Sequence, residues 1–297
     1  MLRPTRLLNI LALAILAALA ASCDRQTARP VVYLEVDSLA LVPDPSKGTS
    51  SAHIRSVWVE AEGRYYGVYP LPARIPLPVD NRNATVRLYP GVEVNGISSF
   101  QAQYEFYAPY TRNLNAEFGQ TVVWPPSGAA VLTYENWAQV VTVEDFESAG
   151  VQLAPTPRSD TVWNRTQSDR FPAPAGETHS ASGMVVLRHG QVIFEAITQQ
   201  AYVLPKSGAS VYLEFNYKST MPFSFGVVAN ENGTSTQQTT VTFREKDTWS
   251  KAYVNLVTEV SAFPGALNYN LFLGAVRTDT TSAADTLWLD NLKLVYR

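Results

Sequence analysis

Short apolar runs separated by turn residues recur along most of this chain and constrain its fold more than any other feature. In the first half such runs cover residues 31–36 (VVYLEV), 54–60, 84–89 and 99–106. The 19 prolines and 16 glycines interrupt the chain at short intervals, and no long stretch has apolar residues at helical spacing. Runs of this length and punctuation are typical of β-strands, so the sequence predicts an all-β protein.

The length of the chain predicts more than one domain. Its 297 residues are too many for one sandwich, since a domain typically has about 100–150 residues. We therefore predict two β-sandwich domains, an N-terminal one over residues 31–135 and a C-terminal one over residues 140–297.

The first residues have the pattern of an export signal. Arg3 and Arg6 are the only early charges, and an apolar segment over residues 10–21 precedes Ser22 and Cys23. A helix that crosses a bilayer needs about 20 apolar residues, so this segment is too short for a span. Residues 1–22 are predicted to be a cleaved signal peptide.

Cys23 is the only cysteine, so the exported chain cannot form an internal disulfide. The segment LAASC at residues 19–23 resembles the lipobox of Bacteroidetes-type lipoproteins, although Ala20 stands where a large aliphatic residue is usual. The resemblance implies acylation of Cys23 with palmitate-like chains, a tether over residues 23–30, and an outer-membrane lipoprotein at the cell surface or periplasmic face. Acyl chains contribute about 0.8 kcal/mol per buried methylene to anchoring. The alternative is ordinary cleavage, which would leave a free thiol.

The charge of the chain argues against nucleic acid as a partner. Loss of the two signal arginines leaves 21 basic against 26 acidic residues, a net charge of −5 instead of −3. The sequence has no cluster of Lys and Arg that could contact phosphates.

Both predicted domains contain segments that resemble known families of β-sandwich. In the first domain, GVYPLP at 67–72 and PGVEVNG at 90–96 resemble small transthyretin-like or Ig-like sandwiches. In the second, VEDFE at 143–147, Trp163 and the closing LWLDNLKL at 287–294 resemble galactose-binding-like jelly rolls, the fold of many carbohydrate-binding modules. The resemblance implies a glycan-binding jelly roll, although this fold has many other functions.

Asp290 lies among apolar residues in the last predicted strand. Alternation along a strand places Asp290 on the face of Trp288, Leu292 and Leu294, where an unpaired carboxylate would be very costly. The jelly-roll resemblance implies one structural calcium ion, with Asp145, Glu147 and Asp290 as oxygen ligands. The alternative is a β-bulge in which Asp290 and Asn291 bond to local backbone.

The polar faces of two predicted strands, 211–218 and 249–256, could bind a sugar. Aromatic rings cover the apolar face of a pyranose, and amides bond to its hydroxyls. The alternative is a solvated strand face above the core. The candidate glycan-binding residues on these two faces are Tyr212, Asn216, Trp249, Tyr253 and Asn255.

Catalysis has little support in the sequence. His53, His179 and His189 are the only histidines and have no paired metal spacing, and there is no Gly-x-Ser-x-Gly motif. We expect a non-catalytic, membrane-anchored lipoprotein that binds a glycan or surface polymer. The alternative is a structural or assembly subunit of an envelope or fimbrial complex, whose sheet edges contact a protein partner.

Overall fold

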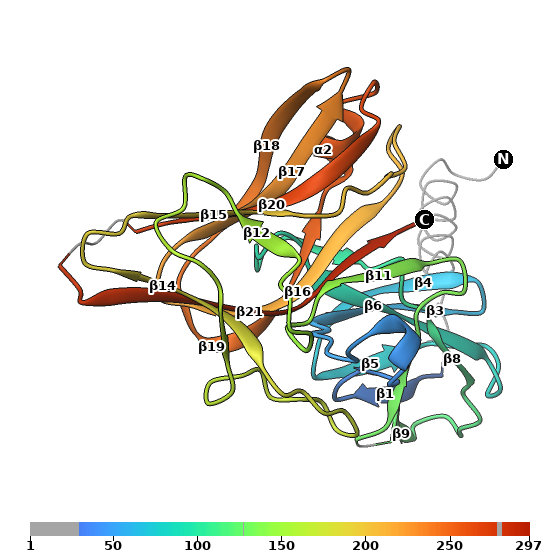
Figure 1. Cartoon of the computed structure of the whole chain (residues 1–297). Coiled ribbons are helices and arrows are strands. Elements are labelled where there is room, and N and C mark those ends of the chain that lie inside the picture. The colour runs from blue at the N-terminus through green and yellow to red at the C-terminus, as the bar shows by residue number, and fades with distance from the viewer. Residues whose placement is uncertain (1–29, 127, 278–280) are drawn as a thin grey trace, which may run out of the picture.

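The computed structural model describes residues 30–126, 128–277 and 281–297. The predicted signal peptide 1–22, Cys23 and nearly all of the tether lie outside these residues. Strands dominate the described chain (Figure 1), which confirms the all-β prediction. No helix over the described residues is long and apolar enough to cross a membrane.

The elements of the first part are β1 (Val32–Val36), β2 (Ala40–Leu41), the 3₁₀ helix η1 (Pro45–Lys47), β3 (Ser56–Ala61), β4 (Arg64–Pro70), β5 (Ala73–Leu77), β6 (Thr85–Glu93), β7 (Gln101–Gln103), β8 (Tyr110–Asn113), β9 (Thr121–Val123) and β10 (Ala130–Leu132). One sheet has the order β4-β3-β6-β7, with β8 also paired to β6. A second has the order β5-β1-β9, and β2 pairs with β10. Alternate residues such as Val57, Val59 and Leu34 form a core between them.

The second part begins with β11 (Gln139–Glu144) and continues with β12 (Leu153–Pro155), β13 (Asn164–Thr166), β14 (Ser182–Arg188), β15 (Ile193–Thr198), β16 (Val211–Ser219), β17 (Phe223–Glu231), β18 (Thr234–Phe243), β19 (Lys246–Asn255), α2 (Val257–Ser261), β20 (Asn268–Val276) and β21 (Ala284–Tyr296). Its two sheets have the orders β13-β14-β21-β16-β19 and β12-β15-β20-β17-β18. From β14 to β21, each connection passes from one sheet to the other, except the hairpin that joins β17 to β18. This is the strand order of an eight-stranded jelly roll.

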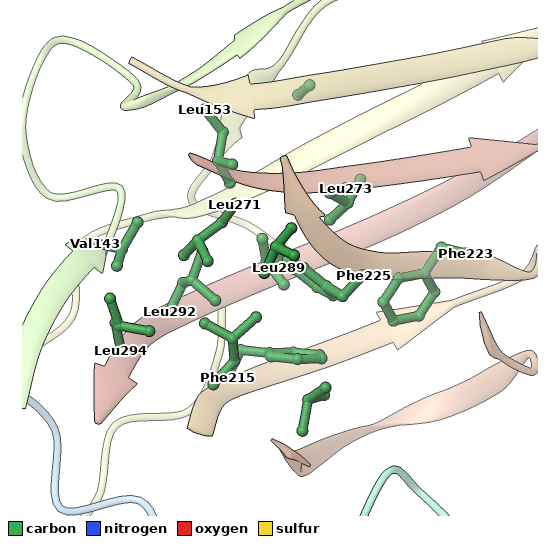
Figure 2. Close-up of a cluster of buried hydrophobic side chains, with 14 of the residues drawn as sticks. Val143, Leu153, Phe215, Phe223, Phe225, Leu271, Leu273, Leu289, Leu292 and Leu294 are labelled. Atoms are coloured by element: carbon green, nitrogen blue, oxygen red, sulfur yellow. The ribbon is translucent and has the colours of Figure 1, made fainter. Parts of the chain in front are cut away.

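Apolar side chains between the two jelly-roll sheets form a continuous core (Figure 2). In β16, Val211, Leu213, Phe215 and Tyr217 point into it, as the alternation in the sequence predicts. The other face of β16 is therefore directed away from the jelly-roll core.

A bulge in β21 changes which residues share its faces. Asn291 has a φ of +54°, and the pairing with β16 shifts register opposite this point. Leu289, Leu292 and Leu294 all lie in the core, whereas Asp290 is on the outer face beside Ser182. The prediction that Asp290 shares a face with Leu292 and Leu294 is therefore wrong, because the extra residue reverses the alternation. The bulge itself is the alternative that the sequence left open.

Candidate functional site

A buried ionic network joins the two halves of the chain at the outer face of β16. Glu214 is fully buried and accepts hydrogen bonds from the hydroxyls of Tyr104 (2.7 Å) and Tyr134 (3.0 Å). Its Oε2 also lies 3.0 Å from Nζ of Lys251 on β19. Burial would raise the pKa of Glu214, but the ammonium groups of Lys251 and Lys293 hold this pKa below its ordinary value.

Lys293 is the second buried cation of this network. Its Nζ donates to the carbonyl of Thr49 at 2.5 Å and to the Tyr134 hydroxyl at 3.3 Å, so a jelly-roll strand is bonded to two segments of the N-terminal half. Burial lowers the pKa of Lys293 to about 7, although the charge of Glu214 acts in the opposite direction.

Most of the predicted glycan-binding residues lie under the N-terminal half. Tyr212 and Tyr253 belong to the N-terminal core cluster, and Asn216 donates to Oγ of Ser51 at 2.9 Å. Asn255 is half-buried and bonds to the Tyr212 hydroxyl at 3.1 Å. The structure therefore brings these four residues together on one face, but the expectation that this face is open to a ligand is wrong.

Trp249, the fifth candidate residue, is covered by a different segment. The loop between β13 and β14 crosses the far end of the same sheet face, where the ring centroids of Phe171 and Trp249 lie 5.5 Å apart. An ion pair of 2.7 Å between Asp169 of this loop and Lys218 of β16 holds it there. The N-terminal half and this loop together cover the face on which the sequence predicted a sugar.

The three predicted calcium ligands are engaged in hydrogen bonds. Asp290 accepts from Oγ of Ser182 at 2.5 Å and from the Asn291 amide, Glu147 accepts from the amides of Ser180 and Ala181, and Asp145 accepts from the amide of Glu147. Among the described residues, no group of three His, Cys, Asp or Glu side chains could hold a metal. Burial raises the pKa of Asp290 to about 7. As arranged, these three side chains do not form the cluster of oxygen ligands that calcium takes.

A cavity of about 280 Å³ lies next to these carboxylates, between the two halves of the chain. The loop of η1 forms one side, and the loop before β14, the end of β11 and the bulge of β21 form the other. The lining residues are Pro43, Asp44, Pro45, Gly48, Thr49, Thr142, Asp145, Glu147, Gly176, Glu177, Thr178, His179, Asn291 and Lys293. Two of the predicted metal ligands therefore line a cavity that both halves are needed to form.

Cross-links between the loops fix the shape of this cavity. Glu177 accepts from the Thr49 hydroxyl (2.8 Å) and from the Ser50 amide (2.6 Å) of the N-terminal half. These bonds keep the pKa of Glu177 below its ordinary value even though burial opposes that shift. Nε2 of His179 lies 3.3 Å from Glu177, while its Nδ1 is buried and has no hydrogen-bond partner among the described residues. The side chain of His179 is only 10% exposed.

Several hydrogen-bonding side chains line the cavity. Asp44 and Asp145 each use one carboxylate oxygen in hydrogen bonds with described residues, and Thr142 and Thr178 lie on the same lining. Such a set suits a small neutral ligand with several hydroxyl groups, because each hydroxyl both donates and accepts. Neither His53 nor His189 is among the lining residues.

The ionic network was not predicted from the sequence. Glu214 and Lys293 each lie between two apolar residues of a strand. Because burying an unpaired charge is costly, this position predicts that each finds a partner of opposite charge. No pattern in the sequence shows that their hydrogen-bond partners Tyr104, Tyr134 and Thr49 come from the other half of the chain.

Neither a family model nor a curated protein matches this chain. Among solved structures, a family 29 carbohydrate-binding module is 9% identical, covers 53% of this chain and 92% of its own, and has a TM-score of 0.33. A family 11 module from Clostridium thermocellum is 10% identical over 52% of this chain and 94% of its own, with a TM-score of 0.36. The enzymatically active domain of tailspike protein 4 from bacteriophage CBA120 is 13% identical over 48% of this chain and 18% of its own, with a TM-score of 0.35. Likeness at this level says nothing about the ligand of this chain.

Proposed function

We propose that this chain is a non-catalytic, lipid-anchored envelope protein that binds a glycan in the cavity between its jelly roll and its N-terminal half. One observation carries the proposal: loops from both halves of the chain form a cavity whose lining includes four acidic side chains and three threonines, beside the side chains of His179 and Lys293. Ligand cavities usually measure about 300–1,000 Å³. A volume of about 280 Å³ therefore suits a single sugar unit or a chain end.

The charges on the cavity favour a neutral ligand. Carboxylates and two basic side chains lie on the same lining, and the oxygens of Glu147 and Glu177 are largely used by donors of the protein itself. A strongly anionic or cationic ligand would bring a like charge close to one of these groups at a cost. Sugar hydroxyls avoid that cost.

A glycan array with the chain from residue 24 onward tests this proposal. Asp145→Ala removes an acceptor from the cavity, and His179→Ala removes a lining side chain that contacts Glu177. We expect each to weaken binding about ten-fold, which corresponds to about 1.4 kcal/mol. Asp247→Ala and His189→Ala are matched controls, because both side chains are exposed and lie outside the cavity. If the folded protein binds no glycan on a broad array, the proposal is wrong.

The anchor is tested separately in cells that process lipoproteins. The full chain should incorporate labelled palmitate and fractionate with the outer membrane, whereas Cys23→Ser should do neither. Incorporation that persists in Cys23→Ser would place the acyl group elsewhere.

An assembly subunit is the second candidate, because β18 is a long strand at the edge of its sheet. Its residues 234–239 are exposed, and among the described strands only β17 pairs with it. Exposed edges of this kind can add a strand from another protein. Mild crosslinking of membranes would then trap a stoichiometric protein partner, and Thr236→Pro should abolish its capture by disrupting the edge.

A further inference from the structure

Three aromatic residues lie together on the outer face of the sheet β4-β3-β6 in the N-terminal half. Trp58 on β3 pairs directly with Tyr89 on β6, and the ring centroids of Tyr65 on β4 and Tyr89 lie 6.2 Å apart at an interplanar angle of 33°. We call Trp58, Tyr65 and Tyr89 the aromatic platform. Tyr65 is 62% exposed and its neighbour Val68 is 46% exposed, so this face is open.

Gly91 leaves room for the indole of Trp58 on the sheet. A Cβ atom at position 91 would stand only 2.1 Å from Cζ3 of Trp58 and 2.4 Å from Oγ of Ser56. The six-membered ring of the indole therefore packs against the glycine, and Trp58 is half-buried. A ring held by such packing has little rotamer entropy left to lose on binding.

Polar groups with balanced charges surround the platform. Glu60 on β3 accepts from the Tyr89 hydroxyl at 2.8 Å and from Nη1 of Arg87 at 2.7 Å. At the other end of β6, Arg55 and Glu93 form a second ion pair at 3.0 Å. Both acidic groups are thus paired with arginines, and the face offers hydrogen-bonding groups without a net charge.

The strand at the rim of this face is poorly suited to pairing with a protein strand. Gly67 of β4 has a φ of +117°, and the pairing of β4 with β3 shifts register between Val59 and Glu60. The strand ends at Pro70, which has no N–H group. A bulge and a proline are two features that block strand addition at an edge.

We infer that the aromatic platform is a second binding surface that takes a stretch of a neutral polysaccharide chain. The inference rests on the proposed glycan-binding function and adds a site and a ligand class to it. Flat rings contact the apolar faces of successive sugar units, while Glu60 and Arg87 bond to hydroxyls at their edges. An open face suits a polymer chain, whereas the cavity between the two halves, the junction cavity, suits a single unit. An anionic polymer gains nothing here, since the arginines are already paired.

Titration calorimetry and affinity electrophoresis with glucomannan, arabinoxylan and xyloglucan, and with polygalacturonate as the anionic comparison, test this inference. We expect Tyr65→Ala to weaken binding of at least one neutral polymer ten-fold or more and Trp58→Ala to weaken it further. Tyr65→Ala should fold normally because most of its side chain is in solvent. Phe100→Ala is the matched control, since Phe100 is 49% exposed outside the platform. Phe100→Ala should leave the affinity for each polymer within two-fold of that of the original chain.

Each outcome separates this inference from the proposed function. If a neutral polymer binds and only Asp145→Ala weakens it, the platform is not a site, but the glycan-binding function stands. If no polymer binds, this inference fails, whereas the proposed function is decided by the glycan array. Preference for polygalacturonate over the neutral polymers would overturn the ligand class. If the chain binds no polymer and Tyr65→Ala abolishes crosslinking to a protein partner, the platform recognises a protein instead.

Discussion

Glu214 shows how one residue can hold two halves of a chain together. Its carboxylate compensates Lys251 directly and lies close to Lys293, and neither cation has another acidic partner within hydrogen-bond reach among the described residues. Removing one member of a buried charge network leaves the others uncompensated, which typically costs about 3–5 kcal/mol. We therefore expect Glu214→Gln to lower the free energy of unfolding by that order.

Chemical denaturation of Glu214→Gln and Glu117→Gln checks this expectation. Glu117 forms an ion pair with Arg82, but both side chains are more than half exposed. Glu117→Gln should therefore change the free energy of unfolding by less than about 1 kcal/mol. Equal effects of the two substitutions would show that the buried network contributes no more than a surface ion pair.

Asp290 gives stability an unusual dependence on pH. Its folded-state pKa of about 7 is above the ordinary value of 3.8, because burial disfavours the charged carboxylate. Between these two pKa values the folded chain therefore holds a proton on Asp290 that the unfolded chain releases. The contribution of Asp290 to the free energy of unfolding is fully present below pH 4 and is lost as the pH rises towards 7. Each unit of pKa difference corresponds to about 1.4 kcal/mol.

Urea unfolding of the original chain and of Asp290→Asn, at pH 5 and at pH 7, isolates this effect. Every other titrating group is present in both proteins, so their contributions cancel in the difference. From pH 5 to pH 7, the free energy of unfolding of the original chain should fall relative to that of Asp290→Asn. Parallel changes in the two proteins would mean that Asp290 titrates normally, as it would if it bound a cation.

At the scale of the element, strands were predictable from alternation, whereas the bulge in β21 was predictable only as one of two alternatives. Alternation in 211–218 identifies both faces of β16 correctly, because the strand is regular over that stretch. In β21 the same rule fails after Asp290, since one residue with positive φ inserts a bulge that no alternation pattern reveals. Asn291 is the only local signal, because asparagine adopts this conformation more readily than most residues.

The candidate site was predictable only in part for a similar reason. The jelly-roll resemblance implied Asp145 and Glu147 as calcium ligands and the structure places them at the cavity, yet the loops that complete it come from residues 43–49 and 176–179. Loops have no periodicity from which their partners can be inferred. The burial of Tyr212 and Tyr253 likewise depends on a second domain that packs on the sheet, and alternation alone cannot distinguish such a face from one that meets solvent.

At the scale of the whole molecule, the two halves are joined by packed side chains and by a backbone bridge. Tyr212, Tyr253 and Val295 belong to jelly-roll strands but pack within the N-terminal core cluster. A backbone bridge also connects Val94, the residue after β6 in one half, to Tyr253 on β19 of the other. Domains joined by a small polar interface move and unfold separately, but a large buried interface opposes both. We therefore expect the chain from residue 24 onward to unfold in one cooperative step.

Differential scanning calorimetry measures this directly. One transition whose calorimetric enthalpy equals its van't Hoff enthalpy indicates a single unit, and two transitions indicate independent domains. Because Glu214 lies at the centre of the interface, Glu214→Gln should lower the transition and, if it weakens the contact enough, split it in two. A split already present in the original chain would show that each half folds on its own. The junction cavity, which needs both halves, could then open and close as the halves separate.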